Sequence, residues 1–272
     1  MKQTLSFLCL LMLASGVFYS CQDSQDVDPS SLNAAERNKL ISLGFDVVNH
    51  VPIRFDGGYL VEGDIYLTPT DLATMGPAKR VAAVEQYSTN QLVTGLPRTV
   101  TVYIPTSSFS AAYVSALDVA ISRYNAENLV LNFQRVTTSN ATIVFTRLRK
   151  GEERQGILGS AGFPTSAGNP YGQIKMSGIL ESTYGLSVNG IATIMAHEMG
   201  HCVGMRHTDY YDRSVSCGGA ASNEGASTVG ANLIPGTPAT ATLAAKSWML
   251  ACTDGSDRPF NNDDKTALNY LY

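Results

Sequence analysis

The sequence predicts an α+β fold, in which an α/β-layered part is followed by an irregular C-terminal part. Apolar alternation over residues 99–104 predicts a strand, and an apolar stripe at helical spacing over 110–125 predicts a helix directly after it. Residues 129–136 and 141–148 then predict two more strands. A strand, a helix and further strands in this order indicate a sheet layer with a crossover connection.

The segment before this layered part has elements of its own. Residues 32–43 predict a short helix, with Asn33 as its N-cap and Gly44 as its stop. Residues 45–72 alternate like strands, with interruptions at three glycines. We interpret residues 33–96 as an N-terminal accessory hairpin or a pro-segment, and 97–272 as the main domain.

A glycine-rich stretch follows the predicted strands. Residues 151–190 contain nine glycines, a density that is typical of loops with at most one or two strands. The best strand candidates within it are residues 173–177 and 179–180.

Two helices are expected toward the C-terminus. Residues 189–203 have the composition of a buried helix, for which Asn189 is the expected cap. Little periodicity remains after residue 204 until 263–270, where Asp263 or Asp264 would cap a short terminal helix.

Composition limits the function classes. The chain has 272 residues, of which 44% are hydrophobic and 15% charged, so it can form a packed core without help from disulfides. Its net charge of -4 argues against a nucleic-acid binder, which needs a basic face. We therefore expect no nucleic-acid partner, and we expect a monomer.

The N-terminus predicts export. One lysine precedes a run of apolar residues from 5 to 18, which is shorter than the roughly 20 residues of a membrane span. Residues 1–20 are therefore predicted to be a signal peptide. Cys21 follows in a loose lipobox and is the expected lipidation site, with residues 21–32 as a polar tether. We expect a lipoprotein of the bacterial outer membrane or cell surface, held only by its lipid anchor, with plain secretion as the alternative.

Three cysteines remain after Cys9 and Cys21 are set aside. Export to an oxidising compartment predicts one disulfide and one free thiol among Cys202, Cys217 and Cys252. Three pairings are open, and Cys217–Cys252 is favoured because both residues lie in the loop-rich C-terminal part.

The motif H-E-x-x-H-x-x-G-x-x-H occupies residues 197–207. His197 and His201 are four residues apart, so a helix places both on one face, where they can bind one zinc ion. Glu198 lies about 100° further round the helix and can reach a water on the metal. Gly204 allows the backbone to leave the helix through positive φ, so that His207 can return as a third ligand.

Three protein ligands favour a catalytic rather than a structural zinc site. A structural site is closed by a fourth ligand, whereas a catalytic site keeps one position for water. Cys202 is an unsuitable fourth ligand because it points about 100° away from His201 on the same helix. A structural site also leaves Glu198 without a role. We expect one Zn²⁺ per chain.

Further residues extend the predicted site. Met249, 42 residues after His207, is a candidate for an apolar floor beneath the histidines. Asp209 could hydrogen-bond a ligand histidine or stabilise a turn, and the sequence does not separate the two readings. The acidic stretches at 254–257 and 261–264 suggest a secondary Ca²⁺ site, although their composition also suits loops and helix caps.

The chain resembles the metzincin metallopeptidases, and most closely the bacterial dual-action HEIGH metallopeptidases. Met199 stands where the family name has Ile, a change between two apolar helix residues. The resemblance is carried by residues 59–67, 197–210, 216–219, 234–238 and 267–272.

This resemblance implies the finer fold. It implies a twisted mixed sheet, a backing helix and an active-site helix above an irregular subdomain in which Met249 forms a Met-turn. It also implies a cleft that binds an extended peptide along an edge strand. Within this sequence, Gly172–Ser177 is our candidate for that edge strand.

The predicted reaction is zinc-dependent hydrolysis of a peptide bond by an endopeptidase, with Glu198 as general base and then acid. Two alternatives are a zinc amidase that acts on a cell-envelope or glycan substrate, and a surface lipoprotein that binds a partner through a non-catalytic zinc site. If the N-terminal segment inhibits the site, its lack of cysteine leaves an aspartate to bind the zinc, either Asp56 or Asp64.

Overall fold

The computed structural model describes residues 31–76, 86–225, 229–238 and 240–272. The predicted signal peptide, Cys21 and most of the tether lie outside the described residues.

The N-terminal segment forms a helix and a small meander. Helix α1 (Ala34–Leu43) begins at Asn33, whose side chain accepts from Glu36 N, and ends at Gly44 with φ 91°, so the predicted cap and stop are confirmed. Three short antiparallel strands and a short helix follow: β1 (Ile53–Phe55), β2 (Gly58–Val61), β3 (Ile65–Leu67) and α2 (Pro69–Thr74).

The layered part follows the predicted order. Strand β5 (Arg98–Tyr103) leads into α3 (Ala111–Asn125), and β6 (Leu131–Val136) and β7 (Ile143–Arg147) come next. Strand β5 pairs in parallel with both β6 and β7. The predicted strand–helix–strand pattern is confirmed.

The glycine-rich stretch contains two strands, one of which the sequence did not predict. After the short helix α4 (Lys150–Arg154), β8 (Gly159–Ala161) pairs antiparallel with β9 (Gln173–Met176). Residues 179–180 form a turn rather than a strand.

Our edge-strand candidate Gly172–Ser177 is wrong, because β9 lies inside the sheet between β8 and β7. Strand β8 is three small residues, Gly-Ser-Ala, with no apolar alternation, and for that reason it escaped prediction.

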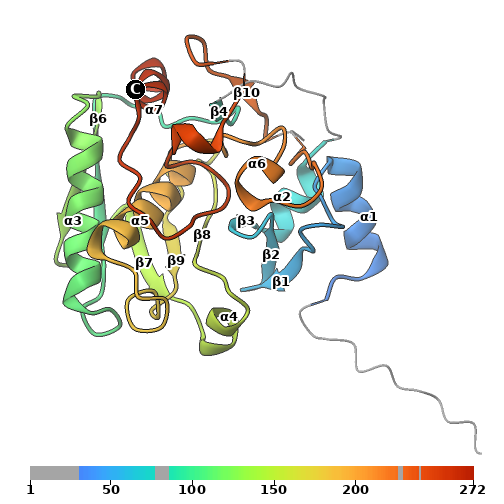
Figure 1. Cartoon of the computed structure of the whole chain (residues 1–272), viewed down its shortest axis with the longest axis horizontal. Helices are drawn as coiled ribbons and strands as arrows, with labels where there is room; N and C mark the ends of the chain where they lie inside the picture. The colour runs from blue at the N-terminus through green and yellow to red at the C-terminus, as the bar shows by residue number, and fades with distance from the viewer. Residues whose placement is uncertain (1–30, 77–85, 226–228, 239) are drawn as a thin grey trace, which may run out of the picture.

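One eight-stranded mixed sheet crosses the molecule, in the order β1-β2-β3-β8-β9-β7-β5-β6 (Figure 1). The N-terminal meander joins this sheet through β3, which pairs in parallel with β8. Helix α3 packs against α5 (Val188–Cys202), and both share the main apolar core with the strands. Helix α5 is capped by Ser187, whose hydroxyl accepts from Gly190 N, and not by Asn189 as expected, because the helix already begins at Val188 and Asn189 lies inside it.

The C-terminal part is mostly irregular, as expected. It contains α6 (Ser214–Cys217), β10 (Asn232–Leu233), the 3₁₀ turn η1 (Leu243–Ala245) and α7 (Asn262–Leu271). Strand β10 pairs with β4 (Tyr87–Ser88). Asn261 caps α7, while Asp264 is the third helical residue and closes the capping box from inside, which corrects the expected cap.

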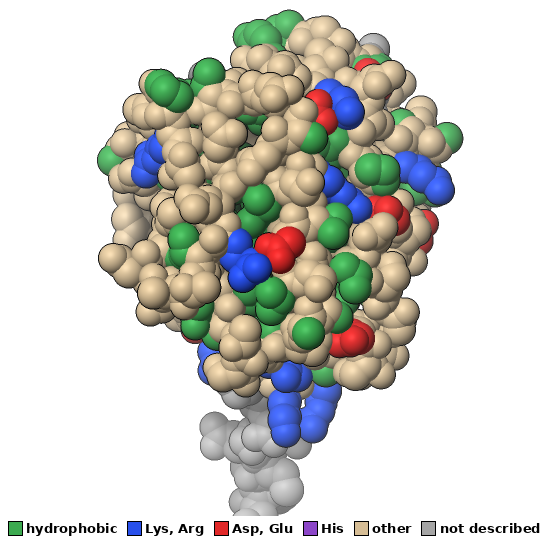
Figure 2. Space-filling model, turned by 90° about the vertical axis from the view of Figure 1, so that its left-hand side faces the viewer, with side chains coloured by type: hydrophobic (Ala, Val, Ile, Leu, Met, Phe, Trp, Pro, Cys, Tyr) green, Lys and Arg blue, Asp and Glu red, His purple; other side chains and the backbone are tan. Residues whose placement is uncertain are grey.

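The surface is sparsely charged. On the α3 side of the molecule, Lys, Arg, Asp and Glu side chains are scattered among neutral ones (Figure 2). Among the described residues, no helix has the length and apolar character needed to cross a membrane.

Candidate metal centre

The first two histidines of the motif lie one turn apart on α5. Their Nε2 atoms are 3.1 Å apart. Helix α5 is buried over nearly its whole length, so both imidazoles are shielded from water.

The third histidine reaches the site because the chain turns sharply after α5. Gly204 has φ 101°, and a Cβ at this position would lie 3.0 Å from the carbonyl of Gln91. Thr89 N donates to the carbonyl of Gly204 at 2.8 Å, which fixes the turn. The positive φ and the close backbone approach both require glycine, as the motif predicts.

Each histidine is oriented through its Nδ1. That atom lies 2.9 Å from Trp248 O in His197, 2.9 Å from Met205 O in His201 and 2.5 Å from Glu224 Oε1 in His207. A carbonyl or carboxylate oxygen can only accept, so each Nδ1 carries a proton, which leaves Nε2 as the atom of each ring that can bind a metal. The three Nε2 atoms converge on one place.

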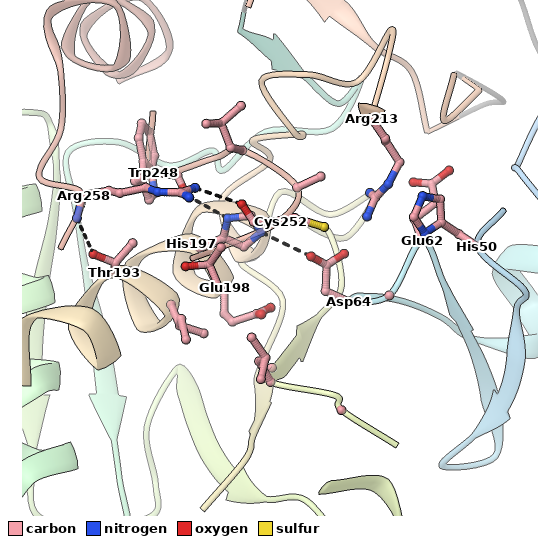
Figure 3. A pocket seen from close by; sticks show the side chains of 18 residues that line it. His50, Glu62, Asp64, Thr193, His197, Glu198, Arg213, Trp248, Cys252 and Arg258 are labelled. Carbon is pink, nitrogen blue, oxygen red and sulfur yellow. Dashed lines mark hydrogen bonds and ion pairs between the residues drawn. The ribbon is translucent and has the colours of Figure 1, made fainter. Parts of the chain in front are cut away.

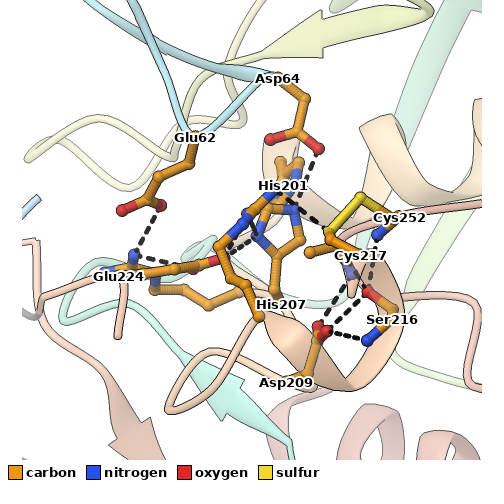
Figure 4. Close-up of polar contacts among 12 residues, drawn as sticks. Glu62, Asp64, His201, His207, Asp209, Ser216, Cys217, Glu224 and Cys252 are labelled. Carbon is orange, nitrogen blue, oxygen red and sulfur yellow. Dashed lines mark hydrogen bonds and ion pairs between the residues drawn. A yellow bond between two sulfur atoms is a disulfide. The ribbon is translucent and has the colours of Figure 1, made fainter. Parts of the chain in front are cut away.

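A carboxylate from the N-terminal segment completes this group. Oδ2 of Asp64, in the turn between β2 and β3, lies 3.1 Å from His207 Nε2 and 3.4 Å from His197 Nε2 (Figures 3 and 4). Burial raises the pKa of this carboxyl, but the facing histidines, His207 above all, outweigh it and hold the pKa well below its usual range. The other aspartate considered, Asp56, instead pairs with Lys175 at 2.7 Å.

These four donors fit zinc. A tetrahedral ion with zinc–nitrogen distances near 2.0–2.1 Å places its ligand atoms about 3.3–3.4 Å from one another. The distances of 3.1, 3.1 and 3.4 Å among the three imidazoles and Asp64 approach that spacing. Among the described residues, candidate metal groups occur only around His207, and neither includes the acidic stretches considered for Ca²⁺.

Glu198 lies beside the histidine cluster, against β8. A Cβ on Gly159 would collide with its Oε1 and would lie 2.8 Å from its Cδ. Its Oε2 is buried and has no hydrogen-bond partner. Burial, together with the charge of Asp64, raises the pKa of Glu198 well above its usual range. A carboxylate with a raised pKa binds a proton more readily than an ordinary glutamate does.

A buried ionic network stands behind His207. Glu224 accepts from Arg213 Nη1 at 2.5 Å and from Arg206 Nη2 at 3.2 Å, in addition to its contact with His207. Burial raises the pKa of Glu224, but His207 and Arg213 outweigh this and lower it far below normal. Glu224 is therefore a fixed anion that holds the third histidine in place.

Met249 lies beneath the helix. A Cβ on Gly200 would come within 2.6 Å of its Sδ, and its carbonyl accepts from Thr208 N at 2.8 Å. The preceding residue, Trp248, supplies the carbonyl that orients His197. The segment 247–250 thus packs against α5 next to the histidines, and the role of Met249 as a floor beneath them stays a prediction.

Asp209 stabilises a loop, and the hydrogen bonds of its carboxylate within the described residues go to that loop rather than to a histidine of the cluster. Its carboxylate accepts from Ser216 Oγ at 2.6 Å and from Ala251 N at 2.9 Å. Next to these contacts, Cys217 and Cys252 form a disulfide, with Cα atoms 5.1 Å apart (Figure 4). Cys202 is free and buried in α5.

A cavity of about 260 Å³ opens beside the cluster. It runs from His197 and Glu198 to Trp248 and Arg258, and Asp64 lies at its rim (Figure 3).

Sequence reasoning missed two residues of the site, Glu224 and Gly159. Glu224 lies 17 residues after His207 in an irregular loop, and Gly159 lies in a strand without a strand signature. No local pattern marks either, because both act through contacts made only in the folded chain.

The three converging histidines, with the carboxylates of Asp64 and Glu198 beside them, form the kind of site found in metal-dependent hydrolases. Residues 59–272 match the dual-action HEIGH metallo-peptidase family, and the chain belongs to this family of metallopeptidases. The matched range includes the turn that carries Asp64.

The other comparisons are weak. No curated protein matches the chain. Among solved structures, it is similar to the one titled "Structure of Myroilysin", with 14% identity, a TM-score of 0.30, and coverage of 43% of this chain and 45% of that chain. The chain thus spans less than half of that protein, and a likeness at this level carries no argument.

Proposed function

We propose that the protein is a zinc-dependent endopeptidase of the metzincin type, which its own N-terminal segment keeps latent. The observation that carries the proposal is the convergence of the Nε2 atoms of His197, His201 and His207 beside the unpartnered Oε2 of Glu198. The three histidines would hold zinc, and the fourth position would be open to water whenever Asp64 withdraws.

Glu198 carries the proton chemistry of this proposal. Zinc, when bound, lowers the pKa of a coordinated water toward ~7 and polarises the scissile carbonyl. Oε2 of Glu198 takes a proton from the attacking water and returns it to the leaving amine. The raised pKa of this carboxyl supports the second step, because a group that holds its proton can deliver it.

Latency is proposed from two contacts of the N-terminal segment. Asp64 occupies the position that water needs, and β3 pairs with β8, the strand along which an extended substrate would add. Both contacts come from one meander, so they would be lost together if the segment left.

The releasable part is proposed to be residues 33–76. Residues 86–93 are integrated into the catalytic part, because Arg206 N donates to Tyr87 O at 2.8 Å and Gln86 Nε2 donates to Asp264 at 2.5 Å. These contacts support a boundary earlier than the 33–96 segment that the sequence indicates.

The cellular setting is also proposed. We propose export, with lipidation at Cys21, and a monomer that contacts the membrane only through its lipid. The Cys217–Cys252 disulfide supports an oxidising compartment. A zinc amidase or a non-catalytic surface binder remain as alternatives, and no specific observation favours either of them.

The test uses residues 22–272 of the chain, with measurement of zinc content and of casein cleavage with and without a chelator. We expect one zinc per chain and slow, chelator-sensitive cleavage. Asp64→Ala should raise cleavage at least about tenfold, because the β3–β8 pairing that remains is a single residue pair, Ile65 with Ala161, which a peptide can displace. Asp56→Ala, in the neighbouring turn, should leave cleavage unchanged. Glu198→Gln should keep zinc but abolish turnover in either background.

The outcomes separate the parts of the proposal. Full turnover by Glu198→Gln would refute its catalytic role. Equal rates for Asp64→Ala and the unaltered chain would refute latency while leaving the peptidase intact. Cleavage of cell-wall polymers but not of casein would favour the amidase.

A further inference from the structure

The cavity beside the metal centre ends at a buried cation. Its lining runs from His197 and Glu198 along α5 to Thr193 and closes at Arg258, whose exposed fraction is 3% (Figure 3). With a volume of about 260 Å³ the cavity suits a single side chain of a bound peptide.

The guanidinium of Arg258 is only partly satisfied by the protein. Nη1 donates to the carbonyl of Cys252 at 2.9 Å, and Nη2 pairs at 3.2 Å with Asp254, whose side chain is 60% exposed. Nε is buried and has no hydrogen-bond partner. A buried donor without an acceptor is costly, and a carboxylate that entered the cavity would relieve that cost.

The charges that line the cavity come from two parts of the chain. The acids Glu62 and Asp64 belong to the proposed blocking segment, whereas Glu198, Arg213 and Arg258 belong to the catalytic part. If the segment leaves, its two carboxylates leave with it, and two arginines face one catalytic carboxylate. Both arginines have a buried Nε without a hydrogen-bond partner. Arg213 is paired with the fully buried Glu224 at 2.5 Å, whereas the carboxylate that pairs with Arg258, Asp254, is 60% exposed, so Arg258 is the cation with the weaker partner.

The direction of β8 indicates which substrate residue enters this cavity. Glu198 lies against Gly159, the first residue of β8, and the cavity extends from there to Leu158 and Gly156. We take the bound peptide to run antiparallel to β8, in which case the residues after its scissile bond would lie toward Leu158 and Gly156. The first side chain after the bond would then point into the cavity.

We propose that Arg258 makes this enzyme prefer an aspartate or glutamate directly after the bond that it cleaves. The inference rests on the proposed peptidase function and names its substrate class. A charge-assisted hydrogen bond to a buried guanidinium corresponds to a preference of about 10- to 100-fold over a neutral residue of equal size.

The test compares two peptides that differ only in Asp or Asn after the scissile bond. The enzyme is the chain of residues 22–272 with Asp64→Ala and Glu62→Gln, which removes both carboxylates of the segment from the cavity. Strand β3 then pairs with β8 only through Ile65 and Ala161, a contact that a bound peptide replaces. Cut positions are read by mass spectrometry. We expect kcat/KM for the Asp peptide to exceed that for the Asn peptide by about 10- to 100-fold. Arg258→Gln should bring this ratio close to one, chiefly through the KM of the Asp peptide, while cleavage of the Asn peptide stays within about threefold.

Arg123→Gln provides the matched control. Arg123 pairs at 2.6 Å with Asp257, next to Arg258 in the same loop, but it does not line the cavity. This variant should keep the Asp preference. The proposal would be overturned if the Asp preference survived Arg258→Gln, or if Arg123→Gln abolished it to the same extent. It would also be overturned if Arg258→Gln lowered kcat/KM equally for both peptides.

A binding measurement keeps this inference separate from the proposed catalysis. The same peptides are titrated, by fluorescence anisotropy, onto the chain that carries Asp64→Ala, Glu62→Gln and Glu198→Gln. Tighter binding of the Asp peptide that depends on Arg258 supports the inference even if no cleavage is seen, in which case only the proposed reaction fails. Equal binding of the two peptides, or none, refutes the inference.

Discussion

Oε1 of Glu224 lies 2.5 Å from Nδ1 of His207, the one ligand histidine that does not belong to α5. The two histidines on the helix are oriented by backbone carbonyls, which the fold supplies regardless of sequence. His207 depends instead on a side chain, and that side chain is held by Arg206 and Arg213. The third ligand is therefore the one whose orientation a single substitution can remove.

We expect Glu224→Gln to weaken zinc binding by about 10- to 100-fold, because the amide cannot hold the Nδ1 proton of His207 as a carboxylate does. Competition with a zinc-chelating dye measures the change, and circular dichroism verifies the fold. Asp209→Asn is the control, since Asp209 is also buried but bonds Ser216 and Ala251. It should lower Tm and keep zinc affinity. Equal affinity losses in both variants would contradict the assigned role of Glu224.

Gly159→Ala tests whether β8 positions the catalytic carboxylate. The new methyl group would collide with Glu198 and turn its carboxylate away from the cluster. In the Asp64→Ala background we expect kcat to fall at least about 100-fold, with zinc content unchanged. Gly172→Ala, at the start of β9, meets only Thr142 O at 3.5 Å and should keep activity. A Gly159→Ala enzyme of normal kcat would show that Glu198 does not need this position.

Asp264 makes stability depend on pH in a definite direction. Burial raises its pKa to about 6, although hydrogen bonds from Ser247, Asn261 and Gln86 partly oppose the rise. In the unfolded state the pKa of this carboxyl is 3.8. Between pH 3.8 and about 6, Asp264 is therefore protonated in the folded state but ionised in the unfolded state. Stability from this group is full below pH 3.8 and is lost as pH rises through about 6.

The free energy of unfolding falls by about 3 kcal/mol over this range, because the folded and unfolded pKa values of Asp264 differ by about 2 and each pKa unit corresponds to 1.36 kcal/mol. Urea unfolding at pH 4, 5, 6 and 7 measures it, with Asp264→Asn as the reference that cannot titrate. The free energy of unfolding of the unaltered chain, relative to that variant, should fall from pH 4 to pH 6 and then level off. A difference that rises over this range would contradict the assignment.

Sequence patterns within a single helix or turn predicted the histidine cluster, because helix periodicity and backbone conformation determine it locally. The 3.6-residue period places His197 and His201 together, and positive φ at Gly204 lets His207 join them, so the histidine cluster can be read from eleven residues. The caps of α5 and α7 were missed by two to three residues, since several polar residues compete at each helix start.

Contacts between distant segments could not be read in this way. Asp64 was one of two candidates, because the sequence does not reveal which turn of the meander faces a site 143 residues away. Strand β8 escaped detection because its three small residues have no periodicity, and its neighbours in the sheet come from elsewhere in the chain. Glu224 and Arg258 have their roles only through burial beside groups that the fold brings to them.

The parallel pairing of β3 with β8 has a consequence for solubility. A sheet border with unpaired amides recruits other chains, and proteins protect such borders with short or charged strands. While the meander is docked, the border of the sheet is β1, a three-residue strand with an arginine at its centre. If the meander left, as we propose, the border would become β8, which is uncharged and ends in alanine. The released enzyme would therefore be more prone to self-association than its precursor, and a bound peptide would keep it dispersed.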